Sequence, residues 1–395
     1  MHIGIVTPAF SAAEDDWCIP VLLDLARVLA ETDRVTVLTL RYPLHTREYR
    51  TFGADVVPFG GGQVRGLPRI PFSLGVLKRF PKEVRRRGIE VLHAMWAHEP
   101  GFLAVREGRR QGIPSVVSLL GGELVDLPHI DYGGRLTSIN RYLVSKALRH
   151  ADRVLVGSRF QYELARPWVP ESRLTLQPMG VDPDLFRQTE PADQITADQI
   201  MADKARLDGA PCLVHVGSMC PVKDHANLLH AFRRILDAEP EARLHLFGDG
   251  DLRPSLEGLA ESLGLAEAVR FHGAVRRESL PELLSQADLQ LFSSLSENSA
   301  MAVIEAAACG CPTVGTAVGA VPDFADFCVS VPTSDPQALA AAALQVLGDP
   351  RRLQTMAEAG TSRSRSDLSI RHTAEALRGI YSELIEDRRR AAASA

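Results

Sequence analysis

The stretch Glu297-Asn298-Ser299-Ala300-Met301-Ala302-Val303-Ile304-Glu305 decides the fold of this chain. Before it, the short apolar run Leu289–Phe292 predicts a buried strand. From Ala300 to Cys309 nearly every residue is small or apolar, and Gly310 follows directly. This order predicts a strand, a polar turn and a buried helix that ends at a glycine.

Two glutamates interrupt this small and apolar stretch. A carboxylate in the middle of an apolar helix, such as Glu305, costs several kcal/mol unless a partner satisfies it. If one helix includes both Glu297 and Glu305, a rise of 1.5 Å per residue places them roughly 12 Å apart along its axis. The N–H groups of a helix N-terminus bind anions, so two flanking carboxylates would suit a sugar, a diphosphate and a ribose in a row. A capping box at Ser294–Glu297 and a structural arginine beside Glu305 are the alternatives.

Strand-like and helix-like segments alternate on both sides of this stretch. In the second half, strands are predicted at residues 212–216, 243–247, 269–272, 289–292 and 313–315, and helices at 224–238, 253–263 and 280–286. In the first half, strands at 3–7 and 35–40 flank a helix at 19–31, and residues 52–72 read as a long irregular loop. This alternation predicts parallel sheets with helices on both faces.

The central stretch, together with Ala306 to Val314 after it, resembles the signature of retaining glycosyltransferase family 4, which has the GT-B fold. Other segments resemble the same family in the same order along the chain: Gly180-Val181-Asp182, Leu213-Val214-His215-Val216-Gly217, Lys223, Leu246-Phe247-Gly248-Asp249-Gly250 and Val269-Arg270-Phe271-His272-Gly273. The resemblance covers most of the chain and is densest between Gly180 and Pro322.

The resemblance implies an α/β fold of the GT-B type, in which two Rossmann-like doubly wound domains face each other across a cleft. The acceptor-binding domain is expected at residues 1–185, and the domain that binds the nucleotide-sugar donor at residues 205–370. The hinge is placed in the polar residues 189–209. The last helix, at about 371–395, should pack back on the first domain.

The resemblance also assigns roles in the second domain. It implies that Glu305 holds the ribose hydroxyls, that Lys223 meets the diphosphate, and that Glu297 faces the donor sugar. Val275 is expected to line the base pocket. The other residues expected to contact the donor are Gly217, Ser218, Gly248, Asn298, Ser299, Ala300 and Met301. Relatives often carry arginine in place of Ser218, so Lys223 should carry more of the diphosphate charge alone.

In the first domain, the loops at residues 94–100 and 120–123 are expected to face the cleft. Many members of the family carry a histidine where this chain has Leu120. The neutral hydrogen-bonding group beside the reacting carbon must then come from another side chain or from the backbone. His98 is the first candidate for this catalytic role and Glu123 the second, and a packed structural histidine beside Trp96 is the alternative.

The implied activity is transfer of a hexosyl unit, with retention, from a nucleoside diphosphate sugar to a hydroxyl acceptor such as a glycolipid, a saccharide or a small molecule. No cofactor and no nucleic acid is expected. No metal is expected either, because the close acidic groups at residues 14–16 and at Asp249 and Asp251 lie away from the helix end at 298–301. Two rivals are a sugar-nucleotide epimerase of GT-B architecture, which needs no acceptor, and a catalytically silent partner subunit.

The composition is ordinary for a globular chain, with 45% apolar and 24% charged residues among 395. This length predicts two domains. No run approaches the roughly 18 apolar residues of a spanning helix, and the first residues predict a strand rather than a signal peptide. The six scattered cysteines form no Cys-x-x-Cys pair, which favours reduced thiols in the cytoplasm.

The net charge of −5 conceals an asymmetry between the two halves. Residues 1–180 hold 24 Lys and Arg against 18 Asp and Glu, whereas the remainder holds 20 against 31. A basic first half indicates an anionic partner, either a phosphorylated acceptor or an anionic lipid surface, and ordinary solvated surface is the alternative. The six positive charges between Lys78 and Arg87 predict a peripheral contact with an anionic membrane, although Pro81 is expected to interrupt any single helix there.

Overall fold

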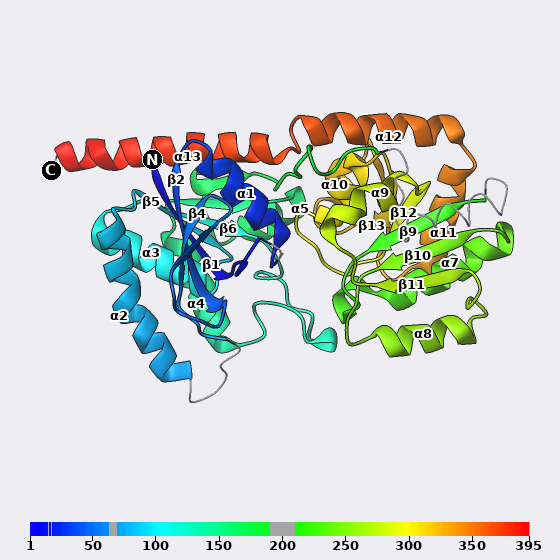
Figure 1. Cartoon of the computed structure of the whole chain (residues 1–395), viewed down its shortest axis with the longest axis horizontal. Helices are drawn as coiled ribbons and strands as arrows, with labels where there is room; N and C mark the ends of the chain where they lie inside the picture. The colour runs from blue at the N-terminus through cyan, green and yellow to red at the C-terminus, as the bar shows by residue number, and fades with distance from the viewer. Residues whose placement is uncertain (15, 17, 63–68, 190–209, 395) are drawn as a thin grey trace. The chain divides into compact units, whose positions relative to one another are not determined.

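The computed structural model describes residues 1–394 apart from residues 15, 17, 63–68 and 190–209 (Figure 1). The chain divides into two compact units. Unit 1 comprises Met1–Met179 together with Ile370–Ala395, and unit 2 comprises Gly180–Ser369. All but the first residue of the hinge expected at 189–209 lies outside the described residues. No helix among the described residues combines the length and the apolar composition needed to cross a bilayer.

Unit 1 is built on an eight-stranded sheet with the order β3-β4-β2-β1-β5-β6-β7-β8. All neighbouring strands run parallel except β3 and β4, which are antiparallel. The strands are β1 (His2–Ala9), β2 (Arg34–Tyr42), β3 (Tyr49–Thr51), β4 (Ala54–Pro58), β5 (Val91–Met95), β6 (Ser115–Leu119), β7 (Arg153–Val156) and β8 (Leu174–Leu176). The helices are α1 (Pro20–Ala30), α2 (Arg69–Arg87), α3 (Glu99–Gln111), α4 (Ser138–His150), α5 (Arg159–Ala165) and α13 (Ile370–Ala393).

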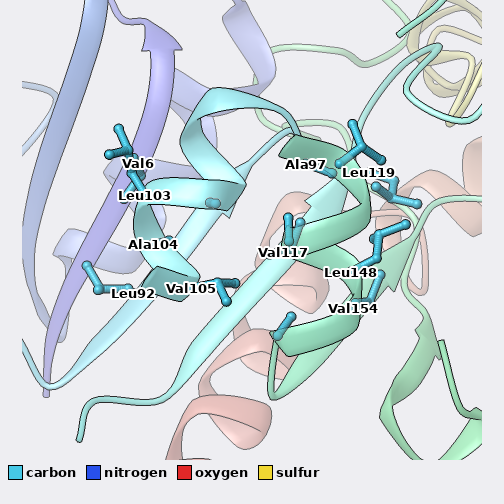
Figure 2. Close-up of a cluster of buried hydrophobic side chains, with 14 of the residues drawn as sticks. Val6, Leu92, Ala97, Leu103, Ala104, Val105, Val117, Leu119, Leu148 and Val154 are labelled. Carbon is cyan, nitrogen blue, oxygen red and sulfur yellow. The ribbon is translucent and has the colours of Figure 1, made fainter. Parts of the chain in front are cut away.

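Helices cover both faces of this sheet, so its central strands are buried along nearly their whole length rather than at alternate residues. Right-handed crossovers place α2, α3 and α4 on one face and α1 on the other, where α13 packs beside α1. Figure 2 shows Leu103 and Val105 of α3 and Leu148 of α4 gathered with Val117 of β6 in one apolar cluster. Both helices therefore bury one stripe against the sheet and leave the opposite face exposed to solvent.

A buried polar chain joins α13 to the centre of the unit 1 sheet. Tyr381 Oη lies 2.5 Å from His93 Nδ1, and His93 Nε2 lies 2.8 Å from Ser118 Oγ. Burial lowers the pKa of His93 to about 3, so the imidazole is neutral. Arg378 adds an ion pair from α13 to Asp33 at 2.8 Å. These contacts hold α13 against the sheet of unit 1.

Two expectations for the segment between β2 and β5 are wrong. Ala54–Pro58 forms β4 in parallel with β2 rather than part of an irregular loop. Helix α2 continues through Pro81, although a proline inside a helix costs about 3 kcal/mol. Val76, Phe80 and Val84 follow one face of α2 at intervals of four residues and are all buried. Each such side chain contributes about 1.5–3 kcal/mol, which together exceeds the cost of the proline.

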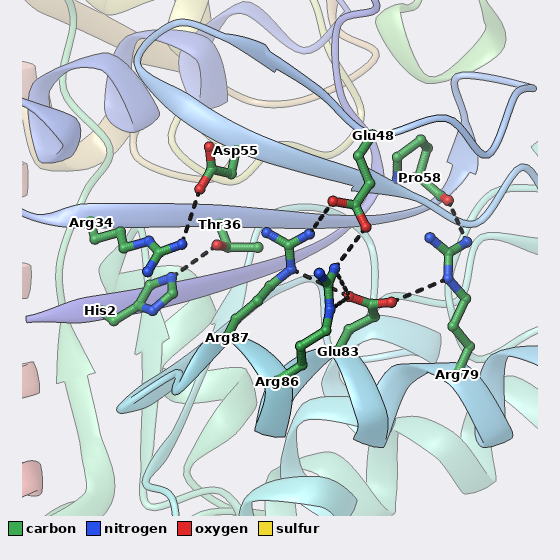
Figure 3. A network of polar contacts seen from close by, with 10 residues as sticks. All are labelled: His2, Arg34, Thr36, Glu48, Asp55, Pro58, Arg79, Glu83, Arg86 and Arg87. Atoms are coloured by element: carbon green, nitrogen blue, oxygen red, sulfur yellow. Dashed lines mark hydrogen bonds and ion pairs between the residues drawn. The ribbon is translucent and has the colours of Figure 1, made fainter.

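The basic segment of α2 forms a network of ion pairs (Figure 3). Glu48 lies 2.8 Å from Arg86 and 2.5 Å from Arg87, and Glu83 lies 2.7 Å from Arg86 and 3.6 Å from Arg79. Burial by itself raises the pKa of Glu83, but the hydrogen bonds and charges of Arg86 and Arg87 outweigh it, and the net pKa is lowered. Three of the six positive charges that were expected to face a membrane therefore share two carboxylates within unit 1.

Unit 2 is built on a six-stranded, fully parallel sheet with the order β11-β10-β9-β12-β13-β14. The strands are β9 (Cys212–Val216), β10 (Arg243–Phe247), β11 (Val269–Gly273), β12 (Leu289–Phe292), β13 (Thr313–Thr316) and β14 (Cys328–Val331). The helices are α7 (His225–Ala238), α8 (Arg253–Ser262), α9 (Leu280–Ser285), α10 (Met301–Ala308), α11 (Pro336–Leu347) and α12 (Pro350–Arg365). The sequence predictions for β9, β10 and β12 are confirmed residue for residue, whereas the edge strand β14 was not predicted.

Replacing Tyr381 with phenylalanine tests the buried chain under α13. The change removes one hydroxyl and leaves a buried nitrogen of His93 without its partner, which costs about 1–3 kcal/mol of the free energy of unfolding. We expect a lower thermal midpoint in a circular dichroism melt. Tyr142→Phe, the same change at an exposed tyrosine, is the matched control and should melt like the parent. Equal midpoints for Tyr381→Phe and the parent would contradict the role of the chain.

Candidate functional site

The carboxyl edge of the unit 2 sheet gathers the candidate residues of the second half. Strands β9, β10 and β11 follow one another in one direction across the sheet, and β12, β13 and β14 follow in the other. The order of strands therefore reverses between the neighbours β9 and β12. In open parallel sheets, ligands bind in the crevice beyond the carboxyl ends of the strands at such a reversal.

The two turns at this reversal are held together by side chains and backbone. Lys223, at the end of the short 3-10 helix Pro221–Lys223 that follows β9, places its Nζ 2.5 Å from Glu297 Oε1. Ser294 Oγ donates to the same carboxylate oxygen at 2.8 Å. Ser293 Oγ donates to the Lys223 carbonyl at 2.7 Å. The two charged side chains are only 19% and 16% exposed, so the ion pair is largely shielded from solvent.

The helix that follows Glu297 starts later than the sequence predicted. Helix α10 begins at Met301 after Ala300, which has φ of 50° and provides no side-chain cap. Glu297 is therefore outside the helix, so the axial spacing of the two glutamates does not apply. The capping box is wrong too, because Ser294 bonds the Glu297 side chain rather than a helical N–H.

The start of α10 exposes backbone donors beside the ion pair. The first N–H groups of an α-helix have no acceptor within the helix, and in α10 the bonds to the Ala300 carbonyl begin with Val303. The turn is held from behind by Gly319, where an added Cβ would lie 2.4 Å from the Asn298 carbonyl oxygen. Ser299 is 5% exposed, and its Oγ has no hydrogen-bond partner among the described residues. These polar groups suit an anion with hydroxyl groups attached.

Glu305 lies on the second turn of α10 and is partly exposed rather than buried. Cys309 lies one helical turn after Glu305. Burial is the main cause that raises the pKa of the Cys309 thiol, and the nearby Glu305 carboxylate raises it further. Partial exposure removes most of the cost expected for a carboxylate in an apolar helix. The side chain is thus a carboxylate acceptor that is not enclosed by the core.

Two glycines bring the turn after β10 into contact with the turn after β9. Gly248 has φ of 138°, and a Cβ there would lie 2.0 Å from the Gly217 carbonyl oxygen, so a side chain is excluded. Ser218 is exposed and lies 3.4 Å from Cys220 Sγ. Val275 is partly buried and packs against the apolar cluster that includes α10. The four residues therefore follow the carboxyl ends of β9, β10 and β11, and their contact with a donor stays a prediction.

In unit 1, His98 caps helix α3. Its Nδ1 accepts a hydrogen bond from the Glu99 N–H at 2.9 Å, which leaves Nε2 as the ring nitrogen that can donate. The preceding Trp96 has φ of 76°, a left-handed conformation that is rare for a bulky residue. His98 is a partly buried residue at the carboxyl edge of the unit 1 sheet.

Glu123 connects two loops of unit 1 through its buried carboxylate. It is 2% exposed, and its carboxylate accepts backbone N–H groups from Gly121 at 2.7 Å, Leu120 at 3.1 Å and Ala97 at 3.4 Å. Burial raises the pKa of Glu123, and the backbone donors oppose that rise. The carboxylate therefore holds the loop after β6 against the loop after β5.

Three residues near Lys223 were not identified from the sequence. Ser294 holds Glu297, and the rings of His215 and His225 pack 4.7 Å apart. His215 Nδ1 donates to the Leu291 carbonyl at 2.9 Å. Burial lowers the pKa of His215 to about 4 and that of His225 to about 2, so both are neutral. The position of His225 two residues after Lys223 was the signal available in the sequence.

Comparison with known proteins assigns the family. Residues 20–185 match Glycosyltransferase Family 4, and residues 197–363 match Glycosyl transferases group 1. The chain belongs to glycosyltransferase family 4. Its D-inositol 3-phosphate glycosyltransferase relative in Thermobispora bispora is 31% identical over 229 residues, which are 55% of this chain and 52% of the relative. The corresponding enzyme of Segniliparus rotundus is 28% identical over 346 residues, covering 82% of this chain and 73% of the relative.

The first of these relatives is matched over only about half of its length. Among solved structures, the sucrose-phosphate synthase of Thermosynechococcus elongatus has a TM-score of 0.77 at 19% sequence identity and covers 98% of this chain and 99% of its own. This likeness concerns the fold, which is GT-B. Glu297 lies before the start of α10, Glu305 lies within that helix, and Lys223 of the 3-10 helix after β9 contacts Glu297.

The role of Glu123 predicts the effect of Glu123→Gln. The amide nitrogen cannot accept a hydrogen bond, so at least one buried backbone N–H loses its acceptor, at a cost of about 1–3 kcal/mol. We expect a lower thermal midpoint than for the parent. Glu375→Gln, at an exposed glutamate of α13 in the same unit, is the matched control. A melt of Glu123→Gln that superimposes on the control would show that the carboxylate does not hold the loops.

Proposed function

We propose that this protein transfers a hexosyl unit from a nucleoside diphosphate sugar to a hydroxyl acceptor with retention of configuration. The observation that carries the proposal is the contact between Lys223 and Glu297 at the strand reversal of unit 2, directly before the N-terminus of α10. One cation, one helix end and two carboxylate acceptors match the groups of a sugar nucleotide.

The chemistry explains why these groups are placed together. When the glycosidic bond to the diphosphate breaks, negative charge grows on the leaving oxygen. Lys223 and the N–H groups at the start of α10, whose dipole is worth about half an elementary charge, then interact more strongly than in the ground state. Such differential stabilisation lowers the barrier, whereas equal binding of both states does not.

The ion pair between Lys223 and Glu297 must break when the donor binds. In this structure Glu297 is the counter-ion of Lys223. A diphosphate that approaches Lys223 repels Glu297 and replaces it as the partner of the lysine. The carboxylate is then available to accept hydroxyl groups of the sugar, while Glu305 accepts those of the ribose and Val275 contacts the base. We assign to His98, with its proton on Nε2, the neutral donor beside the reacting carbon.

We further propose that no metal takes part. Among the described residues, no three His, Cys, Asp or Glu side chains gather into a metal-binding group. Asp249 accepts from the Gly250 N–H at 2.8 Å and contacts Arg253 at 3.4 Å, which gives this acidic turn a structural role. Asp15, of the acidic residues 14–16, lies outside the described residues. The positive charge at the diphosphate would then come from Lys223 and α10.

We place the enzyme in the cytoplasm, where its six cysteines would remain reduced thiols. Its acceptor would be a glycolipid, a saccharide or a small molecule, with no nucleic acid involved. Peripheral contact with an anionic membrane at the cytoplasmic face remains a prediction, and the ion pairs of Figure 3 reduce the positive charge that α2 could offer to it.

A panel of sugar nucleotides tests the function. A ligand at 100 times its dissociation constant adds about 2.7 kcal/mol of stability, so a thermal-shift assay ranks the donors. The best donor is then incubated with and without hydroxyl acceptors, and the products are separated by chromatography. Transfer only in the presence of acceptor supports the proposal. Conversion of the donor without acceptor identifies an epimerase, and binding without any product identifies a silent subunit.

Glu305→Ala should mainly weaken donor binding. The loss of a charge-assisted hydrogen bond to ribose is worth about 1.5–3 kcal/mol, which raises the dissociation constant by roughly 10- to 150-fold. Isothermal titration with the best donor measures this change. Glu261→Ala on α8, at an exposed glutamate of the same unit, should bind like the parent. A folded Glu305→Ala protein with unchanged affinity would make Glu305 structural.

Lys223→Ala should lower turnover about 10- to 1000-fold, the range expected when one group that stabilises a developing anion is removed. Lys78→Ala, at an exposed lysine of unit 1, is the control. Parent activity should be the same in EDTA as in buffer. Activity that disappears in EDTA and returns with magnesium or manganese would overturn the metal-free mechanism, whatever the lysine variant does.

A further inference from the structure

The outer side of α3 and α4 carries a groove of about 470 Å3. Arg106, Arg109 and Arg110 of α3 line it from one side, and Lys146 and His150 of α4 from the other. The opposite sides of both helices are the apolar stripes that pack on the sheet (Figure 2). The groove is therefore a solvent-facing surface of unit 1 that none of the proposed transfer chemistry uses.

The positive charges of this groove are not neutralised. In the part of the chain that the structure describes, Arg106, Arg109, Arg110 and Lys146 form no ion pair, in contrast to Arg79, Arg86 and Arg87 of α2. Arg109 Nη1 instead lies 3.1 Å from His150 Nδ1, which places two basic groups in contact. Burial and the charges of Arg109, Lys146, Arg149 and Arg173 lower the pKa of His150. The groove is thus a region of positive potential.

Apolar side chains extend from the same surface. Ile139 is 62% exposed and Tyr142 is 56% exposed. With Lys146 they follow one face of α4 at positions i, i+3 and i+7. The Lys146 ammonium lies 5.5 Å from the centre of the Tyr142 ring, which also contacts Phe102 of α3 at 6.5 Å. An exposed tyrosine and isoleucine beside unpaired cations are typical of a protein surface that enters the headgroup region of a bilayer.

The placement of these residues distinguishes a bilayer from a small anion. Seven residues of helix separate Tyr142 from Arg149, which corresponds to about 10 Å along α4. A single phosphate group contacts two or three donors and gains no favourable contact from the apolar side chains of Ile139 and Tyr142. A sheet of anionic headgroups above acyl chains complements the whole surface, with charge along the groove and apolar contact at its aromatic end.

We propose that the α3–α4 surface, defined by Phe102, Arg106, Arg109, Ile139, Tyr142 and Lys146, docks the protein on an anionic phospholipid bilayer. Helices α3 and α4 follow β5 and β6, so both begin at the carboxyl edge of the sheet, where His98 also lies. Docking through their first turns brings this edge toward the lipid surface. The proposal replaces α2 with α3–α4 as the membrane-facing element and does not depend on the proposed transfer reaction.

Co-sedimentation with vesicles tests the proposal. The full chain is mixed with vesicles of phosphatidylcholine alone or with one third phosphatidylglycerol, at low and at physiological salt. We expect binding only to the anionic vesicles and weaker binding at higher salt, because salt screens exposed charges. Arg109→Gln combined with Lys146→Gln should weaken binding about 25-fold, since each cation near an anionic surface contributes about fivefold to the affinity.

The matched control is Lys78→Gln combined with Lys82→Gln, which removes the same charge from exposed positions of α2 and should bind like the parent. Ile139→Ser keeps every charge and should also weaken binding. Thermal melts verify that all variants are folded. Equal binding to both vesicle types, loss of binding in the α2 variant alone, or displacement by inorganic phosphate at constant ionic strength would each overturn the proposal.

Discussion

The ion pair between Lys223 and Glu297 is the interaction on which the candidate site depends. It joins residues 74 positions apart, because β9 and β12 are neighbours in the sheet although two other strands separate them in the chain. A lysine in this partly shielded place is costly without a counter-charge, and the carboxylate supplies one in the structure seen here. The pair is therefore near neutrality on its own, and Glu297 can be exchanged for a diphosphate as the partner of Lys223.

The backbone around this pair has little freedom. A side chain at Gly248 or Gly319 would collide with a neighbouring carbonyl at 2.0 Å or 2.4 Å, and Ala300 holds a left-handed conformation that costs about 1–2 kcal/mol. Such conformations persist where the surrounding structure determines them. In unit 1 the buried carboxylate of Glu123 performs the corresponding task by fixing two loops from within. Both units thus support their loops by contacts that a ligand need not supply.

Local patterns in the sequence predicted the strands and helices that are set by interactions between residues close together in the chain. The strands β9, β10 and β12 are short apolar runs between turns, and α10 differs from its prediction by one residue at each end. The edge strands β3 and β14 are short and only partly buried, so they lack that signal. Pro81 was misread because buried side chains, rather than propensity, decide the path of α2. The contact of Lys223 with Glu297 depends on the strand order, which no local pattern contains.

The charges of unit 1 also show that a local sequence pattern does not reveal which residues folding brings together. Six cations in ten residues of α2 form the densest basic run of the sequence, and for that reason this run was expected to face a membrane. Folding brings Glu48 to Arg86 and Arg87 from 38 or 39 residues away, so these two arginines form ion pairs inside the unit. The cations of α3 and α4 are sparse in the sequence, yet folding assembles them without any carboxylate. An anionic surface responds to the charge that remains unpaired after folding, and the α3–α4 surface combines such charge with the exposed side chains of Ile139 and Tyr142.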